Sequence, residues 1–165
     1  MSGTPLNILV LCTGNSARSI IAEALFNHLG GDRVRAHSAG SCPAGQPHAL
    51  ALATLRAHGV PTDGLRSKSW GEFEGADAPR MDVVVTVCDS AAAEACPVWP
   101  GAPAKVHWGV PDPGGAEGDD QARRAAFEAT YAVFRERIEG FLAGAPEAMS
   151  PAEAAARLKA TATTL

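Results

Sequence analysis

A thiol and a guanidinium bound a short loop near the N-terminus, within the stretch LVLCTGNSARS of residues 9–19. Cys12 opens the loop and Arg18 closes it, between an apolar run and a helical pattern. A loop that opens a helix has successive backbone N–H groups without carbonyl partners. Such amides, together with the positive end of the helix dipole, bind a tetrahedral oxyanion. We therefore predict that a phosphate-like group lies between Cys12 and Arg18.

The loop residues between these two groups fit the same interpretation. Gly14 permits a tight backbone path, and the side chain of Asn15 can lock the loop by hydrogen bonds. The guanidinium of Arg18 can bind two oxygens of the anion as a fork. The predicted anion-binding residues are Thr13, Gly14, Asn15, Ser16, Ala17 and Arg18.

Cys12 is placed to be a nucleophile. The helix N-terminus and Arg18 lower the pKa of a cysteine from about 8.5 into the range of roughly 3.5 to 7.5, so we expect a thiolate. Ser19 can donate a hydrogen bond to that sulfur. The alternative is an inert buried cysteine in an ordinary turn, which leaves Gly14 and Arg18 without a purpose.

A second informative stretch, HWGVPDP, covers residues 107–113. Asp112 lies between two prolines, which hold it stiffly on a loop. A stiffly held carboxyl group suits a general acid that protonates a leaving oxygen. An ordinary Asp-Pro turn is the alternative for this stretch taken alone.

The elements that must position these groups alternate between strands and helices. Short apolar runs predict strands, and apolar residues at helical spacing predict helices. The predicted strands are 7–11, 34–39, 81–88 and 104–110, and the predicted helices are 20–29, 49–58 and 119–142. This order predicts a three-layer α/β/α fold with a four-stranded parallel sheet. Because sites form beyond the carboxyl ends of such strands, Cys12, Cys88 and Asp112 are expected to converge.

Three further segments complete this outline. Residues 65–78 form a connection with a helical turn around Trp70 and Phe73, and residues 91–95 are expected to form another turn. We place the catalytic domain at residues 1–143. The tail, residues 144–165, contains a Ser150 cap with Glu153 three residues later, and we expect a weakly attached helix there.

Composition excludes several classes of protein. The 165 residues are 46% hydrophobic and 19% charged, with a net charge of −4, which predicts one folded domain without a basic surface for nucleic acid. No apolar run approaches the roughly 20 residues of a membrane span, and the start lacks a basic leader. Four cysteines are too few and too uneven for a secreted disulfide framework. We expect a cytoplasmic protein with free thiols.

The chain resembles the low-molecular-weight protein tyrosine phosphatases and the arsenate reductases that share their fold. CTGNSARS is similar to their C-x5-R-S signature, and HWGVPDP to the HWG-x-x-DP stretch of the reductases. TVCDSAAAEACP, residues 86–97, looks like the paired-cysteine segment of the reductases. The resemblance extends from about Asn7 to Leu142.

The resemblance implies a reduction of arsenate to arsenite without a bound cofactor. Cys12 attacks arsenic, Asp112 protonates the departing oxygen, and Cys88 and Cys96 are the redox pair. Cys88 attacks Cys12 and passes the disulfide to Cys96, which an external thiol reductant such as thioredoxin reduces. An intact helix would separate Cys88 from Cys96 by about 12 Å, and a disulfide tolerates Cα atoms at most about 7 Å apart. The segment must therefore loop or unwind.

Two departures and two smaller features accompany this resemblance. Ala17 stands where many thioredoxin-coupled members carry a cysteine, so glutathione with glutaredoxin is an alternative reductant. The cysteines of the pair are also one residue further apart than in the thioredoxin-coupled pattern. The histidines show no metal-ligand spacing, and we predict no metal. The positions that hold a monovalent cation in some reductases correspond to Asn15, Glu23 and Ser38, but for Glu23 we expect a solvent-facing residue of its helix instead. Cys42 matches no family motif, and we expect a bystander.

Two rival functions remain open at this point. A phosphotyrosine or phosphomonoester hydrolase needs only Cys12, Arg18 and Asp112, whereas reduction also needs the cysteine pair. A sensor of oxyanions or arsenite would bind its ligand without turnover.

Overall fold

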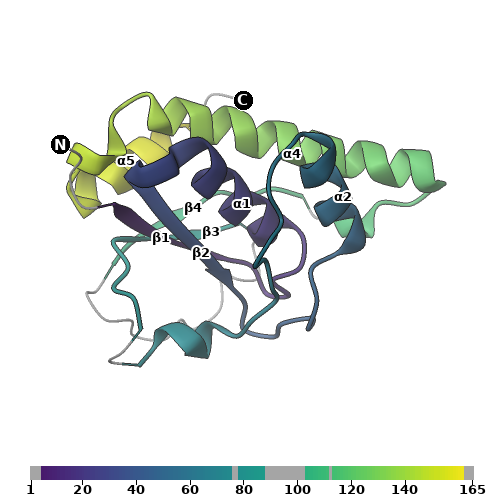
Figure 1. The fold of residues 1–165 in the computed structure, drawn as a ribbon, viewed down its shortest axis with the longest axis horizontal. Coiled ribbons are helices and arrows are strands. Elements are labelled where there is room, and N and C mark those ends of the chain that lie inside the picture. Colours follow the sequence, from purple (N-terminus) through teal and green to yellow (C-terminus); the bar gives the residue numbers. More distant parts are fainter. Residues whose placement is uncertain (1–4, 76–77, 88–102, 112, 162–165) are drawn as a thin grey trace.

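The structure, a computed structural model, describes residues 5–75, 78–87, 103–111 and 113–161 (Figure 1). Cys88, Cys96 and Asp112, and the turn expected at residues 91–95, lie outside these residues. Four parallel strands form one sheet in the order β2-β1-β3-β4. Their bounds are β1 Leu6–Leu11, β2 Val34–Ala39, β3 Val83–Thr86 and β4 Ala104–His107.

Helices follow the strands as the sequence predicts. The α-helices are α1 Arg18–Gly30, α2 Ala49–Ala57, α4 Asp120–Leu142 and α5 Pro151–Thr161. Short 3₁₀ helices are η1 Gly31–Arg33, η2 Trp70–Phe73, η3 Pro113–Gly115 and η4 Pro146–Ala148. In Figure 1, α1, α4 and α5 lie on one side of the sheet and η2 lies on the other. The predicted class, α/β with a four-stranded parallel sheet, is confirmed.

The core lies between the sheet and the helices. β1, LNILVL, is buried along almost its whole length, as expected of a central parallel strand. Aromatic side chains from α1 and α4 and from the segment after β4 fill the space above it. Phe26 stacks on Trp108 with ring centroids 5.7 Å apart and meets Phe141 edge to face. This packing fixes α1, and with it the loop that precedes α1.

The third and fourth strands of the chain, β3 and β4, are shorter than predicted. β3 and β4 end at the pair Thr86 and His107, whereas the apolar pattern extends to residues 88 and 110. Gly109 and Pro111 weaken β pairing after β4. The chain nevertheless continues alongside β3, because the N–H of Val110 donates to the carbonyl of Val87 at 3.2 Å.

The C-terminal helix α5 begins at the predicted capping box. Ser150 Oγ accepts from the N–H of Glu153 at 3.2 Å, and Glu153 Oε1 accepts from the N–H of Ser150 at 3.4 Å. Ala154 and Leu158, one turn apart, are completely buried, and the indole of Trp108 donates to the carbonyl of Leu158 at 2.7 Å. The few apolar residues of α5 thus share one buried face, and the weak attachment expected for this helix stays a prediction. None of the helices in the described part of the chain is long and apolar enough to cross a membrane.

Candidate active site

The predicted loop lies at the carboxyl end of β1, where the strand order of the sheet reverses direction. Cys12 directly follows β1 and is buried, and its N–H donates to the carbonyl of Ala39 at the end of β2. α1 begins at Arg18 after the N-cap residue Ala17. The side chain of Ala17 makes no capping hydrogen bond, so no side chain of the N-cap residue covers the first turn of α1. In open α/β sheets, this is the position at which ligands bind.

A second segment clamps the outside of the loop. Three backbone N–H groups in residues 42–48 donate to three loop carbonyls: Cys42 to Thr13 at 2.9 Å, Ala44 to Gly14 at 2.9 Å, and His48 to Ser16 at 2.8 Å. The C=O and N–H of one planar trans peptide unit point in opposite directions. The amides of Gly14, Asn15 and Ala17 therefore point away from the clamp and toward the inside of the loop, as an anion site requires.

Asn15 locks the loop from within, as predicted. Its φ of 43° is in the left-handed region, which asparagine tolerates better than most residues. The side chain is completely buried and makes three hydrogen bonds. Its Nδ2 donates to Ser19 Oγ at 2.8 Å and to Ser38 Oγ at 2.9 Å, and its Oδ1 accepts from the N–H of Lys68 at 2.8 Å. The predicted bond from Ser19 to the Cys12 sulfur stays a prediction.

Gly40 packs against the loop backbone. An added Cβ would lie 2.5 Å from the carbonyl oxygen of Cys12 and 2.3 Å from that of Thr13. These separations are far below van der Waals contact with backbone atoms that cannot rotate away. Only glycine fits here, and sequence analysis did not single out this residue. The available signal was its position directly after β2, at the same edge of the sheet as Cys12.

Arg18 reaches from the start of α1 to the segment after β4. Its Nη1 donates to the carbonyl of Val110 at 2.9 Å. Val110 lies two residues before Asp112, so the guanidinium meets the segment that leads to the predicted general acid. The N–H of Val87, the residue before Cys88, donates to the carbonyl of Leu11, the residue before Cys12, at 2.9 Å. Val87 and Val110, which lie one and two residues before Cys88 and Asp112, are thus hydrogen-bonded to residues next to or within the loop of Cys12.

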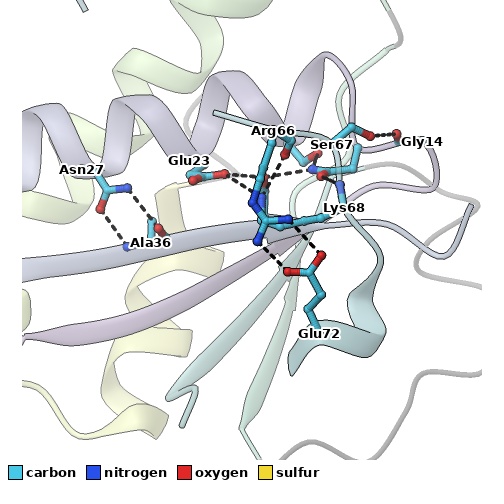
Figure 2. A network of polar contacts seen from close by, with 11 residues as sticks. Gly14, Glu23, Asn27, Ala36, Arg66, Ser67, Lys68 and Glu72 are labelled. Carbon is cyan, nitrogen blue, oxygen red and sulfur yellow. Dashed lines mark hydrogen bonds and ion pairs between the residues drawn. The ribbon is translucent and has the colours of Figure 1, made fainter. Parts of the chain in front are cut away.

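A buried polar cluster lies behind the loop (Figure 2). Glu23 accepts a hydrogen bond from Ser38, whose oxygen in turn accepts from Asn15. The ammonium of Lys68 lies 3.7 Å from Glu23 Oε1, and the two side chains are only 7% and 13% exposed. The three residues that correspond to a cation site therefore do come together. The expectation of a solvent-facing Glu23 is wrong, because this face of α1 packs against Ser38 and Lys68. Lys68, which sequence analysis did not identify, supplies a positive charge beside them.

Burial opposes the charged forms of both ionisable groups in this cluster. It raises the pKa of Glu23, while the charge of Lys68 and the hydroxyl of Ser38 lower that pKa. Burial likewise lowers the pKa of Lys68, and Glu23 raises it. Each group therefore depends on the other to stay charged.

The segment that carries Lys68 supports the loop a second time. Ser67 Oγ donates to the carbonyl of Gly14 at 3.2 Å, and the N–H of Gly40 donates to the carbonyl of Lys68 at 3.0 Å. Figure 2 shows Arg66 turned outward to Glu72, with which it forms a two-point ion pair at 2.6 and 3.0 Å. That pair is exposed and contributes little to stability. The loop is therefore held mainly by its buried contacts.

The described part of the chain contains no group of side chains suited to a metal ion. Within residues 5–75, 78–87, 103–111 and 113–161, no three His, Cys, Asp or Glu side chains gather into a group that could hold a metal ion. Cys42, on the clamping segment, is a free and exposed thiol, in contrast to the buried Cys12.

The four-stranded parallel sheet with its helices, and a buried cysteine and an arginine at one edge of it, place this protein in the α/β class. Within that class, the chain belongs to the family described as low molecular weight phosphotyrosine protein phosphatase, whose model matches residues 7–153. The match includes the loop, the sheet and α4, and it ends just inside α5.

The chain is similar to several arsenate reductases, two of which it matches over almost their whole length. An arsenate reductase of Halalkalibacterium halodurans is 34% identical over 144 residues, which cover 81% of this chain and 93% of the relative. A solved structure described as an arsenate reductase in the phosphate binding state is 25% identical, with a TM-score of 0.67, and the match covers 85% of this chain and 98% of that one. A thioredoxin-dependent arsenate reductase from Corynebacterium glutamicum is 26% identical, with a TM-score of 0.59, over 86% of this chain and 64% of that one.

Proposed function

We propose that this protein is a cytoplasmic arsenate reductase that converts arsenate to arsenite with electrons from thiols. The observation that carries the proposal is the 34% identity to an arsenate reductase over 93% of that relative. An amide-lined loop around a buried Cys12 supports it, because arsenate has the charge and shape of phosphate.

The first step uses the loop and Asp112. Arsenate binds to the loop amides and Arg18, and the thiolate of Cys12 attacks arsenic. Asp112 protonates the departing oxygen, which leaves as water, and a sulfur–arsenic bond forms. Arg18 is positioned for this role by its bond to the carbonyl of Val110. No change in oxidation state has occurred at this stage.

The second step reduces arsenic at the expense of two thiols. The thiolate of Cys88 attacks the Cys12 sulfur and forms a disulfide, and the electron pair of the sulfur–arsenic bond leaves with arsenic as arsenite. Cys96 then attacks Cys88, which releases Cys12 and leaves a Cys88–Cys96 disulfide. The bond from Val87 to Leu11 supports the first exchange, because it joins the chain just before Cys88 to the chain just before Cys12.

An external thiol must supply two electrons to restore the enzyme. Thioredoxin is favoured by the likeness to the thioredoxin-dependent enzyme of Corynebacterium glutamicum. Glutathione with glutaredoxin is the other candidate, because Ala17 replaces a loop cysteine. A bound cofactor is not required.

Arsenite release is the decisive measurement. The purified protein is supplied with arsenate and, in turn, with thioredoxin, with glutaredoxin plus glutathione, or with a mycothiol-type thiol. We expect turnover with one of these reductants, none for Cys12→Ser, and none for Cys88→Ser. Full arsenite formation by Cys88→Ser would overturn the redox assignment.

A phosphatase is the second candidate, favoured by the description of the family that matches residues 7–153. Hydrolysis needs the loop and Asp112 but not the cysteine pair. Hydrolysis of an aryl phosphate by both the wild type and Cys88→Ser, with no arsenite formed by either, would support this candidate. Tight arsenite binding without either turnover would instead indicate a sensor.

A further inference from the structure

One tryptophan of the core donates a hydrogen bond to the C-terminal helix α5. The carbonyl of Leu158 belongs to the last turn of α5, where carbonyls have no partner within the helix. It accepts from Trp108 Nε1 and from Thr161 Oγ1, both at 2.7 Å. The Trp108 side chain is completely buried, so this bond lies away from water.

Trp108 is the first residue of the short segment 108–110, which ends at Val110, the residue whose carbonyl binds Arg18. The N–H of Trp108 donates to the carbonyl of Thr86 at 2.7 Å, and the N–H of Val110 donates to that of Val87 at 3.2 Å. The carbonyl of Val110 then accepts from Arg18 Nη1. Only Gly109 lies between the two anchored residues. The path from Trp108 to the guanidinium of Arg18 is therefore short, and both of its ends are hydrogen-bonded to the chain at the end of β3.

The same segment is joined to α1 at a second point. Phe26, two turns after Arg18 on α1, stacks on the Trp108 ring with an interplanar angle of 14°. The guanidinium carbon of Arg137, from α4, lies 5.8 Å from the centre of that ring. Helices α1, α4 and α5 thus all contact the side chain of Trp108, and α5 accepts the hydrogen bond from its Nε1.

We propose that α5 positions Arg18 for the oxyanion through Trp108 and Val110. Trp108 is a positioning residue in this scheme, since it acts on the anion through Val110 and Arg18. This inference depends on the proposed function only in taking arsenate as the natural oxyanion. Most of α5 lies beyond the part of the chain that matches the family, so this contact is an addition to the family domain.

The test measures binding of inorganic phosphate to the full chain by calorimetry, without any turnover. Trp108→Phe keeps an aromatic ring and removes the N–H that reaches Leu158. We expect the Kd for phosphate to increase about fivefold to tenfold, as for a misaligned charge-assisted hydrogen bond. In an Arg18→Ala background, Trp108→Phe is expected to change the Kd little, because the group on which it acts is absent.

Leu142→Ala is the matched control. Leu142 is buried near the opposite edge of the sheet, where its carbonyl binds Arg33, so its truncation lowers stability without touching this path. We expect its Kd for phosphate to match that of the wild type. If Trp108→Phe does not fold, Leu158→Ala, which loosens α5 and leaves Trp108 intact, carries the test with the same expected increase.

Three results would overturn the proposal: an unchanged Kd in Trp108→Phe, an equal increase in Leu142→Ala at matched loss of Tm, or an equal increase with and without Arg18. Failure of the proposed function is distinguishable, because arsenite release can be absent while the Trp108 and Arg18 substitutions remain coupled in phosphate binding.

Discussion

The ammonium of Lys68 lies 3.7 Å from the carboxylate of Glu23, and both groups are buried behind the loop that carries Cys12. Glu23 binds Ser38, and Ser38 binds Asn15 of the loop. These hydrogen bonds therefore connect a buried ion pair to the geometry of the candidate active site. The positive charge of Lys68 lies beside the residues that correspond to a monovalent cation site.

Lys68→Met is expected to make stability depend more strongly on pH than in the wild type. Loss of the ammonium removes a charge that lowers the pKa of Glu23, so burial raises that pKa further. The folded state then binds a proton more readily than the unfolded state, and stability falls as the pH rises from the ordinary pKa of the carboxyl through the raised one. We expect a loss of about 3 kcal/mol near pH 8 and a smaller loss near pH 5. Urea denaturation at the two pH values measures both losses.

The partner substitution Glu23→Gln is the control for this ion pair. It leaves Lys68 buried without a counter charge and is expected to destabilise at neutral pH, whereas the double variant should lose less than the two single losses combined. Equal losses for Lys68→Met at both pH values would contradict the role of Glu23. Partial recovery of the stability of Lys68→Met by added potassium would show that a cation can replace the ammonium.

Gly40→Ala is expected to disable the loop. The new Cβ must displace the carbonyls of Cys12 or Thr13, from which it would lie 2.5 and 2.3 Å away. We expect phosphate binding to weaken by at least about tenfold, since a displaced backbone misdirects the amides. Gly75→Ala, whose new Cβ meets nothing within 4 Å, is the matched control. Phosphate binding equal to the wild type in Gly40→Ala would show that the loop accommodates the shift.

Two substitutions at Asn15 separate its side-chain bonds from its backbone conformation. Asn15→Gly removes three buried hydrogen bonds but keeps a residue that tolerates a φ of 43°. We expect a loss of about 2 to 3 kcal/mol. Asn15→Ala adds the strain of the left-handed region, so it should lose about 1 kcal/mol more. Denaturant titrations of the two variants give both values, and a more stable alanine variant would contradict the strain.

Asp112→Asn is expected to slow the formation of the sulfur–arsenic bond by about 100-fold, the usual scale for loss of a general acid. The measurement is a single turnover with enzyme in excess, in which later thiol exchange does not limit the signal. Binding of phosphate should remain, because the amide has the size of the carboxyl group. A normal rate would exclude Asp112 from this role.

Cys42→Ser is expected to leave arsenite formation unchanged. The serine retains the backbone N–H that clamps the loop, and the thiol it removes is exposed. Steady-state arsenite release by Cys42→Ser and Cys88→Ser, measured side by side, separates a bystander from a redox thiol. Loss of activity in Cys42→Ser would make Cys42 a member of the exchange chain.

Local sequence was sufficient to predict the strand, loop and helix that contain Cys12 and Arg18. A short apolar run, a glycine and a helical repeat lie next to each other there, so neighbouring residues determine the structure. The capping box of Ser150 and Glu153 was predictable for the same reason, since its two hydrogen bonds span three residues.

Other residues of the site were not predictable because their roles depend on distant parts of the chain. Gly40 matters only because the backbone of residues 12 and 13 passes beside it. Lys68 is an ordinary surface residue type, and its burial follows from the position of Glu23 on α1. The attachment of α5 likewise depends on Trp108, about 50 residues earlier in the chain. Such contacts require the fold before they can be seen.

The outer clamp on the loop has a consequence for selectivity. Loop amides that are fixed in place by hydrogen bonds from residues 42–48 can select an anion only by its charge and its tetrahedral shape. Phosphate and arsenate are nearly the same in both respects. Under the proposed function, cellular phosphate is therefore an unavoidable competitor, and discrimination is achieved after capture, at the step where only arsenic can accept electrons from sulfur.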